Sequence, residues 1–126
     1  MIRRTKYGNK KLEINGVKFD SKLESFCYDL LNKLKFEFEF QKKIILIDGF
    51  RYNKKAIRPI TLTVDFVVKH NDIDYYIDIK GFATDVSKIK YKMLRYQLKD
   101  NPKTDVLWLH SQRGIVQFLN NLKEEK

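Results

Sequence analysis

Hydrophobic and polar residues alternate most clearly in residues 61–82, on both sides of the polar pair Asn71 and Asp72. Runs of β-branched and aromatic residues with this period indicate strands, and two such runs joined by a short polar segment indicate an antiparallel hairpin. With the turn centred on Asn71 and Asp72, residues whose numbers sum to 143 lie opposite each other. This register predicts that Asp65 faces Asp78.

Strict alternation along these two strands also predicts which side chains share a face of the sheet. On the first strand, one face carries Thr61, Thr63, Asp65 and Val67, and the other carries Leu62, Val64, Phe66 and Val68. On the second strand Tyr76, Asp78 and Lys80 share a face, which places Lys80 opposite Thr63.

The rest of the pattern predicts helices and short strands around this hairpin. Asn15-Gly16 indicates a small hairpin in residues 12–19, and apolar residues at helical spacing predict a helix from Asp20 or Ser21 to about Leu34. Its buried stripe is Leu23, Phe26, Cys27, Leu30, Leu31 and Leu34. One or two strands follow at 36–40 and 44–47, a strand is predicted at 104–109, and a final helix opens at Ser111 or Gln112.

A second long helix is predicted from Thr84 or Asp85 to about Lys99. The spacing indicates an inward face made of Val86, Ile89, Met93 and Tyr96 or Gln97. Residues 51–59 read as a basic loop after the turn chemistry of Asp48-Gly49. Together these elements predict an α/β (α+β) fold in a single domain of residues 1–126, in which residues 1–11 form a basic arm. That arm is either a frayed terminus or a contact to phosphates.

Charge narrows the class of partner. The net charge of +10 and pI near 9.6 point to a polyanion, with nucleic acid ahead of an anionic membrane surface. No apolar run approaches the roughly 20 residues that span a bilayer, and the basic N-terminus has no apolar segment typical of a secretory signal. The lone Cys27 fits a reducing compartment. We therefore expect a cytoplasmic protein with no membrane partner.

The facing aspartates suggest a metal site. Like charges directly opposite each other on a sheet destabilise it, so Asp65 and Asp78 need an offsetting cation. Mg²⁺ takes carboxylate oxygens and keeps several waters, which suits such a pair. Lys80 would lie beside that ion, where it could hold a phosphate or a water.

Two sets of basic residues are candidate contacts to a phosphate backbone, although a solvated surface is the default for each. The first lies in the loop at Lys54, Lys55 and Arg58. The second follows one side of the second helix at Lys88, Lys92, Arg95 and Lys99.

Glu24 has two readings that local physics leaves open. Ser21-Lys22-Leu23-Glu24 matches a capping box, in which the glutamate bonds the cap residue, but the same carboxylate could serve a metal or its water. Both histidines and Trp108 are read as structural, although base stacking by Trp108 stays open.

The order of these elements and their polar landmarks resembles the PD-(D/E)XK nuclease superfamily over roughly residues 16–109. The chain is particularly similar to small phage-encoded, restriction-endonuclease-like proteins, through Phe-Asp-Ser-Lys-Leu-Glu at 19–24, Asp-Phe at 65–66 and Asp-Ile-Lys-Gly-Phe-Ala-Thr at 78–84. Val64 stands where the motif that names the superfamily has proline.

This resemblance implies roles for individual residues. Asp65 and Asp78 would bind the metal, Lys80 would orient or activate the attacking water, and Glu24 would contact the metal or its water. Gln41 and Thr84 match positions near such sites more loosely. The implied cofactor is Mg²⁺ or Mn²⁺.

The resulting expectation is a metal-dependent DNA endonuclease in phage recombination, replication or packaging, working with other phage DNA-processing proteins. Four-way junctions are one candidate substrate, and because their cleavage normally needs two active sites it would predict a homodimer. The alternatives are a basic nucleic-acid-binding protein that keeps the fold without cleaving, and a nuclease that acts on RNA.

Overall fold

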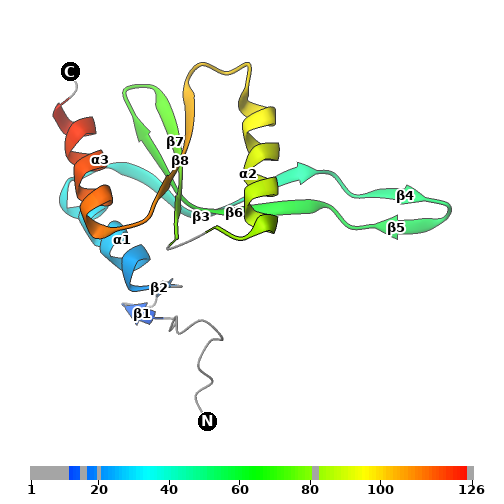
Figure 1. Cartoon of the computed structure of the whole chain (residues 1–126), viewed down its shortest axis with the longest axis horizontal. Coiled ribbons are helices and arrows are strands. Elements are labelled where there is room, and N and C mark those ends of the chain that lie inside the picture. The colour runs from blue at the N-terminus through cyan, green and yellow to red at the C-terminus, as the bar shows by residue number, and fades with distance from the viewer. Residues whose placement is uncertain (1–11, 15–16, 20, 81–82, 125–126) are drawn as a thin grey trace, which may run out of the picture.

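The computed structural model describes residues 12–14, 17–19, 21–80 and 83–124, and within them the chain forms a mixed α+β fold (Figure 1). The helices are α1 (Lys22–Lys33), α2 (Asp85–Leu98) and α3 (Gln112–Glu124). The strands are β1 (Leu12–Ile14), β2 (Val17–Phe19), β3 (Glu37–Ile47), β4 (Phe50–Tyr52), β5 (Lys55–Ile57), β6 (Ile60–His70), β7 (Ile73–Ile79) and β8 (Thr104–Leu109). The predicted arm at residues 1–11 lies outside the described residues.

The central sheet has the strand order β3-β6-β7-β8. β3 and β6 are antiparallel, as are β6 and β7, whereas β7 and β8 are parallel because α2 carries the chain across between them. The β6–β7 hairpin turns at Asn71 and Asp72, both with positive φ. Phe66 pairs with Ile77 and His70 with Ile73, which confirms the predicted register.

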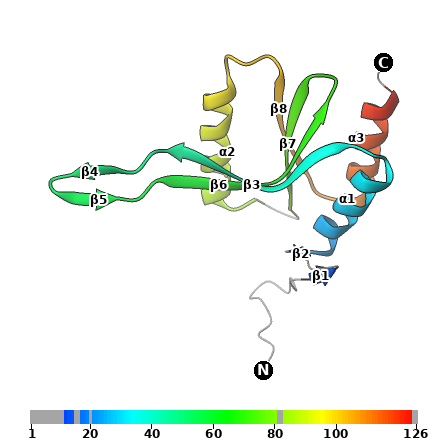
Figure 2. The same cartoon turned by 180° about the vertical axis from the view of Figure 1, so that it is seen from behind.

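Helices cover both faces of this sheet. Figure 1 shows α1 and α3 on one side of the sheet and α2 on the other, and the view from behind in Figure 2 shows the same arrangement. The core under α1 and α3 includes Cys27, Leu31, Phe66, Ile77 and Leu119. The core under α2 includes Leu46, Leu62, Val64, Val67, Tyr91 and Leu94. The predicted buried stripe of α1 is confirmed, since its apolar residues are buried or pack against the first core.

The predicted inward face of α2 is wrong at Val86, Ile89 and Tyr96, which are exposed. Met93 does pack against the second core, and Gln97 Nε2 donates to the Ile45 and Leu46 carbonyls of β3. The side chains that the helix buries are instead Ser87, Tyr91 and Leu94, with Leu98 packed beside them. Both sets follow helical spacing, so periodicity alone did not decide between them. Tyr91 and Leu94 pack in one cluster with side chains of β6 and β8, so close packing against the sheet selected the face that carries them.

Residues 51–59 are not an irregular loop. They contain most of a two-stranded β4–β5 hairpin, in which Phe50 pairs with Ile57 and Tyr52 with Lys55. This hairpin prolongs the β3–β6 ribbon beyond the sheet and projects from the body of the protein (Figure 1). From here on, "the arm" means this hairpin, residues 48–58, and not the predicted N-terminal arm at residues 1–11.

The strict alternation predicted along β6 is interrupted at Asp65. Val64 and Val67 belong to the core under α2, whereas Phe66 belongs to the core under α1 and α3. β3 changes faces at the same level, because Phe40 packs in the first core and Ile44 in the second. Among the helices of the described chain, none is both long and apolar enough to cross a membrane.

Candidate active site

Asp65 and Asp78 meet in the middle of the sheet. They lie one residue beyond the Phe66–Ile77 pair, and the exposed fractions of their side chains are 9% and 1%. Asp65 Oδ2 accepts a hydrogen bond of 2.8 Å from the backbone N–H of Ile79, which draws this carboxylate across to β7. The tertiary structure therefore buries two acidic side chains beside each other, as the register predicts.

Their electrostatics are unfavourable in the absence of a cation. Burial, followed by the negative charge of Asp78, raises the pKa of Asp65 to about 9 from an ordinary value of 3.8. Asp78 Oδ2 is buried and has no hydrogen-bond partner among the residues described. A buried oxygen without a donor costs free energy unless a ligand completes its coordination.

Lys80 provides the nearest positive charge. Its Nζ lies 3.5 Å from Asp78 Oδ2, and its side chain is partly exposed. The backbone holds the residue in place, because the Lys80 N–H donates to the Leu109 carbonyl and the Lys80 carbonyl accepts from His110 Nδ1 at 3.0 Å. The ammonium lies 6.0 Å from the centre of the Trp108 ring. It thus stands between a buried carboxylate and solvent.

Glu24 reaches the same region from α1. Its backbone N–H donates to Ser21 Oγ, the N-cap of the helix, while its carboxylate accepts from Gln41 Nε2 at 3.3 Å. The cap and the Gln41 contact use different groups of Glu24, so they are compatible. The side chain is buried, and its charge contributes to raising the pKa of Asp65.

Gln41 lies across the sheet from Asp65, between the Phe40–Phe66 and Lys42–Val64 pairs. Its φ of 54° is rare for a residue other than glycine inside a strand, and such strain concentrates at functional sites. This geometry marks the point where β3 and β6 change faces. Gln41 therefore lies opposite Asp65 on the neighbouring strand while its side chain bonds to Glu24.

Thr84 is the N-cap of α2, as the sequence predicts. Its hydroxyl accepts from the Ser87 N–H, and its own N–H donates to Ser87 Oγ. Its observed contacts are therefore those of a helix cap.

Two aromatic residues lie near Asp78: Trp108, which the sequence analysis reads as structural, and Tyr91, which it does not single out. Tyr91 is buried under α2, and burial followed by the charge of Asp78 raises the pKa of its hydroxyl. Neither Tyr91 Oη nor Trp108 Nε1 has a hydrogen-bond partner within the described chain, and the two rings lie 5.1 Å apart. The helical spacing of Ser87, Tyr91 and Leu94 was the signal that could have placed Tyr91 on the inward face.

In the described ranges, no three His, Cys, Asp or Glu side chains gather closely enough to hold a metal ion. The site accordingly consists of the Asp65–Asp78 pair with Lys80 beside it, and of Glu24, which bonds to Gln41 and acts electrostatically on Asp65. The basic stripe of α2 is exposed, and Lys99 pairs with Asp100 at 2.8 Å. Lys54, Lys55 and Arg58 lie on the exposed arm, which projects from the body of the protein (Figure 1).

Comparison with family models matches residues 4–111 to a family described as a protein of unknown function, DUF1064. The chain belongs to DUF1064. The part that matches DUF1064 contains Glu24, Asp65, Asp78 and Lys80, and it ends just before α3. The DUF1064 description names no activity, and a search of curated proteins found no match to the chain.

Proposed function

We propose that this DUF1064 protein is a Mg²⁺- or Mn²⁺-dependent DNA endonuclease of the PD-(D/E)XK type, hydrolysing phosphodiester bonds. The observation that carries the proposal is the buried Asp65–Asp78 pair, in which Asp78 Oδ2 has no donor in the described chain and Lys80 Nζ lies 3.5 Å away. Apolar side chains of similar volume would make a more stable sheet at these positions. A pair that costs stability is better explained by chemistry than by folding.

The donor set fits a hard divalent cation. Asp65 and Asp78 would hold the ion, and because Mg²⁺ keeps several waters, two carboxylates are enough. When bound, the ion would polarise a phosphoryl oxygen and lower the pKa of a bound water. Gln41 would hold the Glu24 carboxylate toward this water shell through its 3.3 Å hydrogen bond.

Lys80 supplies the other charge. Its ammonium is anchored beside Asp78 yet partly exposed, so a phosphate entering from solvent would meet it first. A fixed positive charge stabilises the negative charge that develops on the phosphoryl oxygens in the transition state. The backbone hydrogen bonds of Lys80 to Leu109 and His110 limit the reorganisation that this requires.

The net charge of +10 and the exposed basic stripe of α2 support a nucleic acid substrate. Phage recombination, replication or packaging would use such an enzyme. Resolution of four-way junctions would further require two active sites, and hence a homodimer.

The test is cleavage of linear, nicked, single-stranded and four-way-junction DNA with Mg²⁺, Mn²⁺ or EDTA. Metal-dependent cleavage of at least one substrate is expected. Asp78→Asn and Lys80→Ala should each lower the rate by about 100-fold or more while DNA binding is retained. Matched controls are Asp105→Asn and Lys103→Ala, exposed residues of β8 and the turn before it, which should cleave like the wild type.

The competing function is a basic nucleic-acid-binding protein without catalysis. Binding with no cleavage of any substrate, or cleavage that persists in EDTA, would favour it or another mechanism over the metal-dependent nuclease. Normal cleavage by Lys80→Ala would remove that residue from the proposed chemistry.

A further inference from the structure

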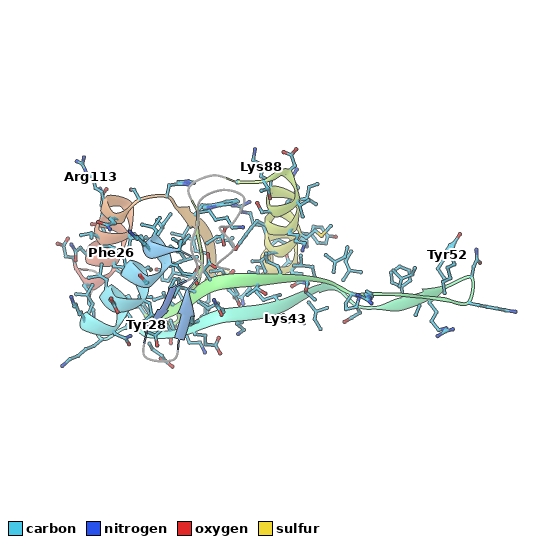
Figure 3. All side chains as sticks on the ribbon, turned by 90° about the horizontal axis from the view of Figure 1, so that it is seen from below. Phe26, Tyr28, Lys43, Tyr52, Lys88 and Arg113 are labelled. Carbon is cyan, nitrogen blue, oxygen red and sulfur yellow. The ribbon has the colours of Figure 1, made fainter. Side chains whose placement is uncertain are left out.

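The arm has no packing partner within the part of the chain that is described. Every residue from Ile47 to Pro59 is exposed, and Figure 3 shows Tyr52 far out on the hairpin, well separated from the body. Gly49 and Pro59 interrupt the ribbon at its base, where a Cβ on Gly49 would come within 3.2 Å of Pro59. A two-stranded hairpin on its own is marginally stable in water, so exposure of this length calls for a partner.

The two faces of the arm differ in chemistry. Directly opposed residues point to the same side of an antiparallel pair, so Phe50, Tyr52, Lys55 and Ile57 share one face. Phe50, Tyr52 and Ile57 are exposed large apolar side chains. The other face carries Arg51 and Ala56. One side therefore offers aromatic contacts and a lysine, and the other a guanidinium.

The tip of the arm breaks a rule of turn chemistry. Asn53 and Lys54 both have positive φ, at 48° and 65°, and glycine is preferred at the second of these positions. Arg51 supports the turn by donating to the Lys54 carbonyl at 3.0 Å. A lysine kept where glycine would be less strained places a cation at the far end of the hairpin.

Charge identifies the class of partner. Residues 48–58 contain four basic side chains, Arg51, Lys54, Lys55 and Arg58, against the single acidic Asp48. Two arms from identical copies would repel each other, whereas a polyanion attracts them. Apolar and cationic side chains together also suit the major groove of a duplex, where apolar groups contact thymine methyl groups and Arg or Lys binds guanine.

We propose that the arm inserts into the major groove of double-stranded DNA and gives this protein its preference for duplex B-form substrates. The inference rests on the proposed function for its choice of substrate. The backbones of a two-stranded ribbon lie about 4.8 Å apart, and the B-form major groove, about 12 Å wide, admits such a ribbon. The deep, narrow major groove of A-form RNA excludes it.

The spacing along the chain is compatible with one bound duplex. Lys54 at the tip of the arm and Asp65 are 11 residues apart, through β5, two linking residues and the first half of β6. At roughly 3.3 Å each, these residues span at most about 36 Å. One turn of B-form DNA measures about 34 Å. The arm and the aspartates would therefore contact the same duplex about one turn apart.

Binding in EDTA tests this directly. Affinities for a 20-base-pair DNA duplex, the matching single strand and the matching RNA duplex are compared between the wild type and the double variant Lys54→Gly and Lys55→Ala. We expect duplex DNA binding to weaken about tenfold or more, with single-strand and RNA binding changed less than threefold. The slope of log affinity against log salt should fall by about 2 for the duplex.

The matched control is Lys33→Ala with Lys103→Ala, which removes the same charge at exposed positions outside the arm and α2. An equal loss in the control, or an equal loss on all three nucleic acids, would overturn the inference. Lys54→Gly also relieves the strained turn, so misfolding of the arm does not explain a loss of binding.

Photo-crosslinking supplies the second measurement. With Tyr52 replaced by a photoreactive phenylalanine, the inference requires crosslinks to duplex DNA that are absent when only the single strand is supplied. Crosslinks to a second copy of the protein instead would overturn it. Cleavage tests the proposed function separately. If the wild type cleaves DNA but the arm variant binds the duplex normally, the nuclease proposal stands and the role of the arm is refuted. If the wild type cleaves nothing but the arm variant loses duplex binding, the role of the arm stands and the nuclease proposal is refuted.

Discussion

Burying one carboxylate is costly, and burying two together is costlier. Asp65 and Asp78 bear this cost in the centre of the sheet, where Asp78 Oδ2 has no hydrogen-bond partner in the described chain and the Lys80 ammonium lies 3.5 Å away. The strained backbone of Gln41, directly across from Asp65, is a second departure from ordinary strand chemistry. Departures of this kind coincide with functional sites more often than with folding needs.

The raised pKa of Asp65 predicts how stability depends on pH. The folded state favours the protonated carboxyl, so this group does not oppose folding below about pH 4, and it destabilises the fold increasingly as pH rises through 4 toward 9. In EDTA, Asp65→Asn should therefore melt above the wild type at pH 8 but not at pH 4. A difference of 1 kcal/mol corresponds to roughly 3–6 °C in a domain of this size.

Thermal unfolding of both proteins across this pH range checks the expectation. Mg²⁺ should raise the melting temperature of the wild type more than that of Asp65→Asn, because the ion offsets the repulsion only where both carboxylates are present. If the melting temperatures of the two proteins differ by the same amount at pH 4 and at pH 8, this penalty does not belong to Asp65.

At the scale of elements, α2 joins several functions in one helix. It buries Ser87, Tyr91 and Leu94 against the sheet, exposes an apolar stripe, and carries the basic residues on a third side. The reciprocal Thr84–Ser87 capping box fixes the N-terminus of α2, and Thr84 follows Lys80 by four residues in the sequence. The cap therefore sets where the helix begins relative to the site.

Thr84→Ala should destabilise the protein by about 1 kcal/mol while Thr84→Ser, which keeps the hydroxyl, should not. If capping is the whole role of Thr84, cleavage per folded molecule should be unchanged in both variants. Denaturant unfolding combined with cleavage rates separates the two effects. A rate loss in Thr84→Ala at temperatures where it is fully folded would show that the hydroxyl also acts at the site.

At the scale of the whole molecule, positive charge is spread over surfaces that the site does not include. The stripe Lys88, Lys92, Arg95 and Lys99 follows α2, and the arm carries a separate set. Such contacts release counterions from DNA and are sensitive to salt.

Lys88→Ala combined with Lys92→Ala should weaken binding to every DNA tested and reduce the slope of log affinity against log salt by about 2. The loss should be similar for duplex and single strand, unlike that of the arm variant. Fluorescence anisotropy between 50 and 200 mM salt measures both. An unchanged slope would mean that this stripe is simply solvated.

The sequence by itself determined the order of the helices and of the central strands, the extent of α1 and α2, and the register of the central hairpin. These depend on local signals: helical spacing, the cap at Ser21, and the polar turn at Asn71 and Asp72. Because the register of a hairpin follows from its turn, the meeting of Asp65 and Asp78 could be predicted from numbering alone.

Only the tertiary structure decided which face of α2 is buried, because two apolar stripes satisfied the same period and packing against the sheet chose between them. It also decided that residues 51–59 contribute to a projecting ribbon, and that Gln41 bonds to Glu24. The interruption of alternation at Asp65 lies opposite the positive φ of Gln41 on the neighbouring strand. Such contacts between residues distant in sequence have no local pattern from which they could be inferred.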